Sequence, residues 1–279
     1  MLIKKALLLT SIVLLLAGCS SSKMVTVNVQ EDSLTVNTST VSSTAAAGQD
    51  MKTSSEAVKT IISTTKKTVV APVSTSTAKE VSIPAEVQWP VLFASQAPLT
   101  NWDALHEEAC EEASMIMAVK YFKKLPLNNN IMEEEIQRLV KWETDNGYGV
   151  DLNAEEIVRV MADYFSFNVK ISREVNVDQI KYELSNGNLI IIPAAGRDLH
   201  NPNFKAPGPI YHMLVIKGYN SSQFITNDPG TRKGSGYRYD YAALIGATHD
   251  WNQKLTQQGV MSEENMRLGD KVMTIVSRP

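Results

Sequence analysis

Residues 210–230 read IYHMLVIKGYNSSQFITNDPG, and this stretch decides the fold. Two runs rich in apolar and β-branched residues, Ile210–Tyr219 and Gln223–Asn227, are separated by a short polar turn. Such a pattern predicts a β-hairpin. Adjacent antiparallel strands place the beginning of one strand beside the end of the next. We therefore expect His212 and Asp228 to be neighbours.

Helices precede this hairpin, and further strands surround it. Helical periodicity and capping residues predict the helices, and apolar runs predict the strands. The expected helices are Ala109–Lys123, Ile131–Thr144, Asn153–Phe165, Val177–Ser185 and Tyr241–Ala247, and the other expected strands are Asn168–Ser172, Leu189–Pro193 and Lys271–Val276. The segments 89–102, 194–209 and 230–236 are rich in Pro or Gly and are expected to be irregular. Helices followed by a mostly antiparallel sheet indicate an α+β fold with the helices packed on that sheet.

The aromatic residues locate the folded part of the chain. All 19 Phe, Trp and Tyr residues fall at or after Trp89. Since aromatic side chains supply much of the buried area of a core, we expect one folded domain over residues 86–279. The net charge of −3 excludes a strongly basic nucleic-acid-binding protein, and two cysteines exclude a disulfide framework.

The first 18 residues have the features of an export signal. Lys4 and Lys5 precede an apolar run over residues 6–16, which is too short to span a bilayer comfortably. The following Leu-Ala-Gly-Cys, ending at Cys19, resembles the lipobox of bacterial lipoproteins. That resemblance implies lipidation of Cys19 and an extracytoplasmic protein anchored to the cell membrane by two or three lipid chains. The alternative is an ordinary signal peptide with a chance cysteine.

Residues 19–85 have the composition of a linker. From Ser20 to Glu80, 24 of 61 residues are Ser or Thr, and none is aromatic. Such a segment buries too little apolar surface to offset the entropy of ordering it, so we expect a disordered spacer. The alternation of Val and Thr over residues 26–36 is the one feature that favours a small β domain instead.

Three residues have the chemistry of a catalytic triad. Cys110 stands at the start of an expected helix, where unpaired N–H groups and the helix dipole favour a thiolate. Alone, Cys110 is typical of a small core residue, His212 of a structural histidine and Asp228 of a turn. Together they form the set in which histidine activates a thiol and a carboxylate orients the imidazole.

The three blocks that carry these residues resemble the peptidase C39-like family, a bacterial branch of the papain-like cysteine peptidases. They are CEEAS from Cys110, YHMLVIKGY from Tyr211 and NDPGT from Asn227, and the resemblance covers roughly residues 93–251. It implies a papain-like fold, with Cys110 as nucleophile, His212 as general base and acid, and Asp228 as the orienting residue. It also implies an upstream glutamine that stabilises the oxyanion, for which Gln96 is the best candidate, beside the backbone N–H of Cys110. The family usually has Cys-Gly-Pro where this chain has Cys-Glu-Glu.

Four carboxylates surround the cysteine in the sequence and bear on the pKa of its thiol: Glu107, Glu108, Glu111 and Glu112. Like charge disfavours a thiolate. In a helix, however, the last two are rotated by about 100° and 200° from Cys110, so neither need face the sulfur. We therefore predict that pairing with His212 prevails and that the pKa of Cys110 lies below that of a free thiol.

Other polar residues have less specific patterns. His106 precedes two glutamates but has no second histidine at a metal-binding spacing, so no metal site and no cofactor are expected. The long loop over 194–209, with Gly196, Arg197 and Asn201, is expected to line the substrate groove. Trp102 is a groove wall or packs the extended segment that carries it.

The leading prediction is a surface-anchored thiol hydrolase that cleaves peptide or isopeptide bonds through a thioester. Its expected partners are a peptide or cell-wall peptide substrate and the membrane, with no nucleic acid, and the chain is expected to be monomeric. One alternative is a transglutaminase-like acyl transferase, and another is a cell-wall peptidase of the NlpC/P60 type, whose third catalytic residue is usually a histidine. The non-enzymatic alternative is an inactive papain-like binding module.

Overall fold

The structure is a computed structural model, and it describes residues 83–279. The predictions made for residues 1–82, which include the signal peptide, lipidation of Cys19 and nearly all of the linker, lie outside the described residues.

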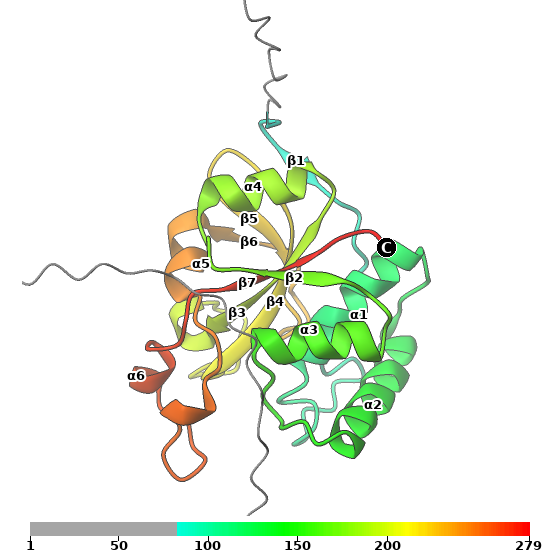
Figure 1. The fold of residues 1–279 in the computed structure, drawn as a ribbon, viewed down its shortest axis with the longest axis vertical. Coiled ribbons are helices and arrows are strands. Elements are labelled where there is room, and N and C mark those ends of the chain that lie inside the picture. Colours follow the sequence, from blue (N-terminus) through cyan, green and yellow to red (C-terminus); the bar gives the residue numbers. More distant parts are fainter. Residues whose placement is uncertain (1–82) are drawn as a thin grey trace, which may run out of the picture. The chain divides into compact units, whose positions relative to one another are not determined.

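One antiparallel sheet forms the centre of the fold (Figure 1). Its strands run in the order β2-β7-β3-β4-β5-β6, and β1 pairs with β4. They are β1 Val87–Gln88, β2 Val169–Ser172, β3 Leu189–Ala195, β4 Tyr211–Tyr219, β5 Gln223–Asn227, β6 Ser235–Asp240 and β7 Met273–Val276. The predicted hairpin is β4–β5, with Val215 opposite Asn227 in the register. The α+β fold class is confirmed.

Helices cover both faces of the sheet. They are α1 Cys110–Lys123, α2 Asn129–Asp145, α3 Ala154–Asp163, α4 Val177–Ser185, α5 Tyr241–Ala247 and α6 Glu263–Met266, with short 3₁₀ turns η1 Gly196–Leu199 and η2 Gln253–Leu255. The first three pack on one face and α4 and α5 on the other, so two separate apolar clusters flank the sheet (Figure 1).

The central strands β3 and β4 are apolar along their whole length, rather than alternating, because both faces of the sheet are covered there. Along β3, Ile191 contributes to the cluster beneath α1–α3, whereas Ile190 and Ile192 contribute to the cluster beneath α4 and α5. On β4, Met213 and Leu214 divide between the clusters in the same way. Successive side chains of a strand point to opposite faces, and here both faces are covered.

Capping residues set the helix starts. The predicted capping box of α3 is present: Asn153 accepts from the backbone N–H of Glu156, whose side chain accepts from the N–H of Asn153. At α2 the N-cap is Asn128, which accepts from the N–H of Ile131. This helix therefore begins two residues before the predicted start, because the polar residues between cap and apolar face hid its first turn.

Two segments predicted to be irregular contain regular structure. In the segment 194–209, β3 continues to Ala195 and is followed by η1. The turn over 230–236 passes into β6, which the sequence analysis missed. Tyr239 is the one fully buried residue of β6, and the strand therefore has no run of apolar residues that would have predicted it. Pairing with β5 makes it a strand.

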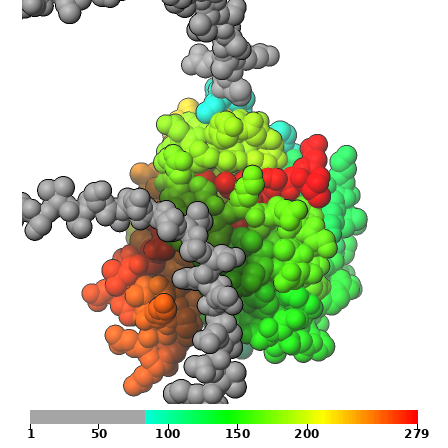
Figure 2. All heavy atoms as spheres, in the orientation of Figure 1, coloured from blue at the N-terminus to red at the C-terminus, as the bar shows by residue number. Residues whose placement is uncertain are grey.

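The C-terminal part of the chain returns to the sheet as β7, which is inserted between β2 and β3. In Figure 2 this segment (red) emerges between α4 and α3, consistent with the pairing of β7 to both β2 and β3. Within residues 83–279, no helix has the length and apolar character needed to cross a bilayer.

Candidate active site

Cys110 is the first residue of α1 and lies under the surface, with 5% of its area exposed. The helix crosses the sheet over β4, where Ser114 donates a hydrogen bond to the carbonyl oxygen of Met213 at 3.2 Å. This crossing carries the start of α1 to the beginning of β4, where His212 stands. The thiol itself donates to Oε2 of Glu111 at 2.9 Å.

Glu111 does face the thiol, although its helical rotation had left it free to point away. Glu111 is buried, with 1% of its area exposed, and its Oε1 accepts from the backbone N–H of Leu152 at 3.1 Å. The rotation of 100° per residue describes the backbone, whereas the long Glu111 side chain folds back beside its neighbour. The segment around Leu152 then closes over it.

This environment also reverses the predicted acidity of the thiol. Burial, together with the charge of Glu111 and the hydrogen bond to it, raises the pKa of Cys110 well above its ordinary value. Glu111 is affected in the same direction, since burial and the charge of Asp151 raise the pKa of its carboxyl group. The prediction of a lowered thiol pKa is therefore wrong for this arrangement.

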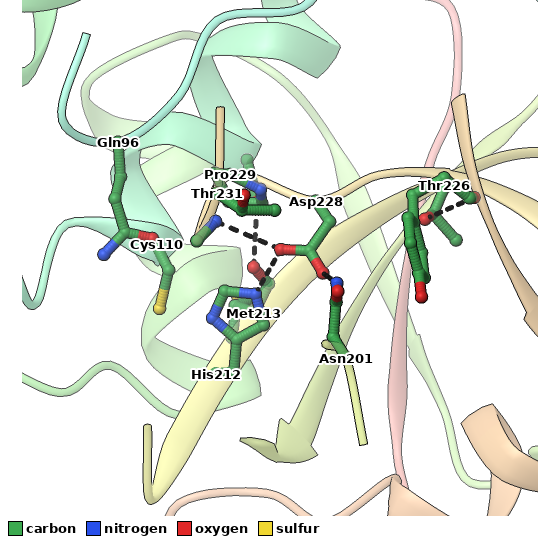
Figure 3. Close-up of polar contacts among 12 residues, drawn as sticks. Gln96, Cys110, Asn201, His212, Met213, Thr226, Asp228, Pro229 and Thr231 are labelled. Carbon is green, nitrogen blue, oxygen red and sulfur yellow. Dashed lines mark hydrogen bonds and ion pairs between the residues drawn. The ribbon is translucent and has the colours of Figure 1, made fainter. Parts of the chain in front are cut away.

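His212 and Asp228 form the contact that the hairpin predicts. Nε2 of His212 lies 2.8 Å from Oδ1 of Asp228, and both side chains are buried (Figure 3). The same carboxylate oxygen accepts from the backbone N–H of Gly230 at 3.0 Å. Its other oxygen accepts from Asn201 at 3.0 Å and from the hydroxyl of Tyr239 at 2.5 Å.

These four donors keep Asp228 ionised in the interior. Burial raises the pKa of Asp228, but the charge and hydrogen bond of His212, with the bonds from Tyr239 and Gly230, outweigh burial and leave the pKa below its usual value. Asn201 was predicted to line the groove but holds Asp228 instead, and Tyr239 was not predicted as a site residue. The signal for Tyr239 was the alternation of Tyr237, Arg238 and Tyr239 within β6, which the neighbouring Gly236 obscured.

The imidazole ring is held on its faces as well. Phe204 packs edge-on against the ring of His212, with centroids 5.2 Å apart. A Cβ atom at Gly230 would lie 2.8 Å from Cε1 of His212, so this close approach requires glycine. These contacts leave Nδ1 as the imidazole nitrogen available to another group, and Figure 3 draws it on the side of the ring toward Cys110.

The thiol and the imidazole face the same cavity, which has a volume of about 490 Å³. Cys110 and His212 both line it, as do Gln96 and Trp102. Among residues 83–279 no hydrogen bond joins the thiol to the imidazole, because the thiol donates to Glu111 instead. The arrangement is thus a cysteine and a carboxylate-bound histidine facing one substrate-sized cavity.

Residues 82–259 match the model of the Peptidase_C39 like family. The chain belongs to the peptidase C39-like family. Membership places it among the C39-like cysteine peptidases, and the family resemblance seen in the sequence is confirmed. No curated protein matches the sequence significantly.

Two solved structures resemble this C39-like chain. One is a protein from Bacillus anthracis assigned as a C39-like peptidase, with 11% identity and a TM-score of 0.44, covering 70% of this chain and 98% of its own. The other is xylellain, a cysteine protease from Xylella fastidiosa, with 11% identity and a TM-score of 0.34, covering 71% of this chain and 87% of its own.

In this C39-like domain Gln96 lines the cavity, but its amide N–H groups already have backbone acceptors. Its N–H groups donate to the carbonyl oxygens of His106 at 2.9 Å and Glu107 at 3.0 Å. Its Oε1 is buried without a hydrogen-bond partner. Gln96 therefore presents an acceptor here, whereas an oxyanion requires a donor.

His106 belongs to a separate polar network. Its two nitrogens lie 2.7 Å from Asp103 and 3.0 Å from Glu133, and Asn101 contacts the same ring. This network ties the segment before α1 to α2. Among residues 83–279 no group of three or more His, Cys, Asp or Glu side chains is arranged to hold a metal ion.

Proposed function

We propose that this chain is a thiol hydrolase that cleaves peptide or isopeptide bonds with Cys110 as nucleophile, His212 as general base and acid, and Asp228 as the orienting residue. The observation that carries the proposal is the hydrogen bond between Nε2 of His212 and Asp228, with Nδ1 left for a thiol that lines the same cavity. A carboxylate at Nε2 fixes the ring and stabilises the imidazolium that forms.

The reaction begins when the thiol turns from Glu111 to the imidazole. The proton passes from Sγ of Cys110 to Nδ1 of His212, and sulfur attacks the substrate carbonyl carbon. The tetrahedral intermediate collapses when His212 protonates the leaving amine, which leaves a thioester on Cys110. A water molecule, deprotonated by His212, then attacks the thioester carbonyl carbon. The C–S bond breaks, the carboxylic acid is released, and Sγ of Cys110 takes the proton back from His212.

Two donors are proposed for the oxyanion. The N–H of Cys110 is at the start of α1, where N–H groups lack acceptors within the helix. The amide of Gln96 is the second, after it rotates away from the carbonyl oxygens that it now contacts.

We propose further that Cys19 is lipidated and anchors the domain outside the cell membrane, through the linker over 19–85. Metabolic labelling of the full chain with an alkynyl fatty acid tests this. Label on the wild type and none on Cys19→Ala is the expected result, and equal labelling of both would contradict it.

The test of the hydrolase is cleavage of a defined peptide library by the full chain, read by mass spectrometry. We expect cleavage by the wild type and its loss in Cys110→Ala and His212→Ala, together with an acyl adduct on Cys110 after acid quenching. Incorporation of ¹⁸O from labelled water into the new carboxylate distinguishes hydrolysis from acyl transfer to an added amine. Undiminished cleavage by Cys110→Ala would refute the proposal.

A binding module is the second candidate, because the resting thiol is buried and held by Glu111. It predicts that the wild type and Cys110→Ala bind the same library peptides equally and that neither cleaves them.

A further inference from the structure

One wall of the catalytic cavity is acidic and lacks matching cations. Glu107, Glu108 and Asp151 all line it. Lys205 is the one lysine or arginine among the lining residues, and it lies 3.4 Å from Glu107. Within residues 83–279, the carboxylates of Glu108 and Asp151 make no ion pair and no hydrogen bond to another side chain.

These two carboxylates also act on each other. Burial raises the pKa of Glu108, and the charge of Glu107 adds to that effect. Burial and the charge of Glu108 raise the pKa of Asp151 to about 7. The wall therefore carries like charges that repel one another, with Glu107 and Glu108 exposed and Asp151 partly buried, an arrangement that a bound cation would relieve.

A second and independent feature of the same cavity is Gln96. Its side chain is buried, with 3% of its area exposed, and its Oε1 has no donor. An unpaired buried acceptor is costly and is normally satisfied by a partner. This acceptor is neutral, and it is unpaired in the present orientation of the amide, before the rotation proposed above for binding an oxyanion.

The chemistry that suits such a cavity is a primary ammonium, which carries three N–H donors, a positive charge and no acceptor. We propose that the cavity selects peptides with a lysine-like primary ammonium next to the scissile bond, bound by Glu108 and Asp151, an inference that rests on the proposed peptidase function. Trp102 and Trp251 also line the cavity and supply apolar surface for the methylene stem of such a side chain.

The first experiment measures binding without catalysis. The full chain carrying Cys110→Ala is titrated by calorimetry at pH 8 with acetyl-Ala-Lys-Ala-amide and with the same peptide acetylated on the lysine side chain. Acetylation removes the charge and retains most of the stem. We expect it to weaken binding by about tenfold or more, as lost charge-assisted hydrogen bonds predict.

Two charge-neutral variants and one control locate the effect. Glu108→Gln and Asp151→Asn, each added to Cys110→Ala, should bring the two affinities within about twofold of each other. Glu264→Gln removes an equal charge from an exposed residue of α6 that is not among the cavity-lining residues, and it should leave the discrimination intact. Equal binding of the two peptides by the parent, or full discrimination in Glu108→Gln, would overturn the proposal.

The second experiment separates this inference from the proposed function. Wild-type chain is given a peptide library in which each lysine is paired with its side-chain-acetylated form. Cleavage that favours the free ammonium supports both proposals. Cleavage that ignores acetylation overturns the charge selection and keeps the hydrolase. Discrimination in binding without any cleavage by the wild type overturns the hydrolase and keeps the ammonium site.

Discussion

The hydroxyl of Tyr239 is expected to stabilise the domain by holding Asp228. It donates to Oδ2 of that carboxylate at 2.5 Å and accepts from the side chain of Asn201 at 2.8 Å. All three side chains are buried. Tyr239→Phe keeps the ring and removes only the hydroxyl, so water cannot readily replace the lost donor.

The magnitude follows from the charge on the acceptor. A buried hydrogen bond to a charged group contributes about 1.5–3 kcal/mol. In a domain of roughly 150–250 residues, 1 kcal/mol corresponds to roughly 2–4 °C in the melting temperature. We therefore expect Tyr239→Phe to lower the melting temperature by about 3–12 °C at pH 7.

Thermal unfolding followed by far-UV circular dichroism measures this change. The matched control is Tyr237→Phe, on the same strand and packed against Tyr239 with ring centroids 4.8 Å apart. Within residues 83–279 the hydroxyl of Tyr237 makes no hydrogen bond, so its removal should have little effect. Equal melting temperatures for the two variants would refute the reasoning that Tyr239 supports the carboxylate. Tyr239→Phe should also slow the proposed peptide cleavage, because the role proposed for Asp228 is to orient the imidazole.

Three further predictions follow from single residues of the site and of the core beside it. Glu111→Gln removes a charge and the acceptor of the thiol hydrogen bond, so the pKa of Cys110 should fall. Alkylation of Cys110 by iodoacetamide at pH 7 should then be faster, by roughly tenfold for each unit by which the pKa falls. An unchanged dependence of the alkylation rate on pH would show that Glu111 does not control the thiol. Gly230→Ala places a methyl group 2.8 Å from Cε1 of His212 and should reduce kcat by about tenfold or more, with little change in far-UV circular dichroism; wild-type turnover would mean that the ring is free to shift. Burial raises the pKa of Glu143 from 4.5 to about 7, so the folded domain favours the neutral form of this side chain. The contribution of Glu143 to stability is therefore fully present below about pH 4.5 and is lost as the pH rises through about 7. Urea unfolding of Glu143→Gln should therefore depend less on pH between 5 and 8 than that of the wild type, and an identical dependence would contradict this assignment.

The parts of the site that were predictable are those governed by local geometry. His212 and Asp228 are 16 positions apart, His212 on β4 and Asp228 directly after the end of β5, and a short turn joins the two strands. The strand pattern alone therefore placed them together, and the hydrogen bond of 2.8 Å between them agrees with that prediction. The helix start at Cys110 was predictable from periodicity in the same way.

What the tertiary structure decided is which polar side chains are buried and what they contact. Glu111 turns toward the thiol because Leu152, 41 positions away, supplies a donor to its other oxygen. Tyr239 reaches Asp228 because β6 pairs with β5, although β6 has no apolar run of its own. Periodicity along a chain reports which face of an element is apolar, and it carries no information on which distant segment will cover a polar group. The sequence by itself therefore determined the α+β order of elements and the three candidate catalytic residues. The protonation of the thiol and the acidic character of the cavity depended on contacts between segments far apart in the chain, because burial and neighbouring charge are properties of the assembled fold.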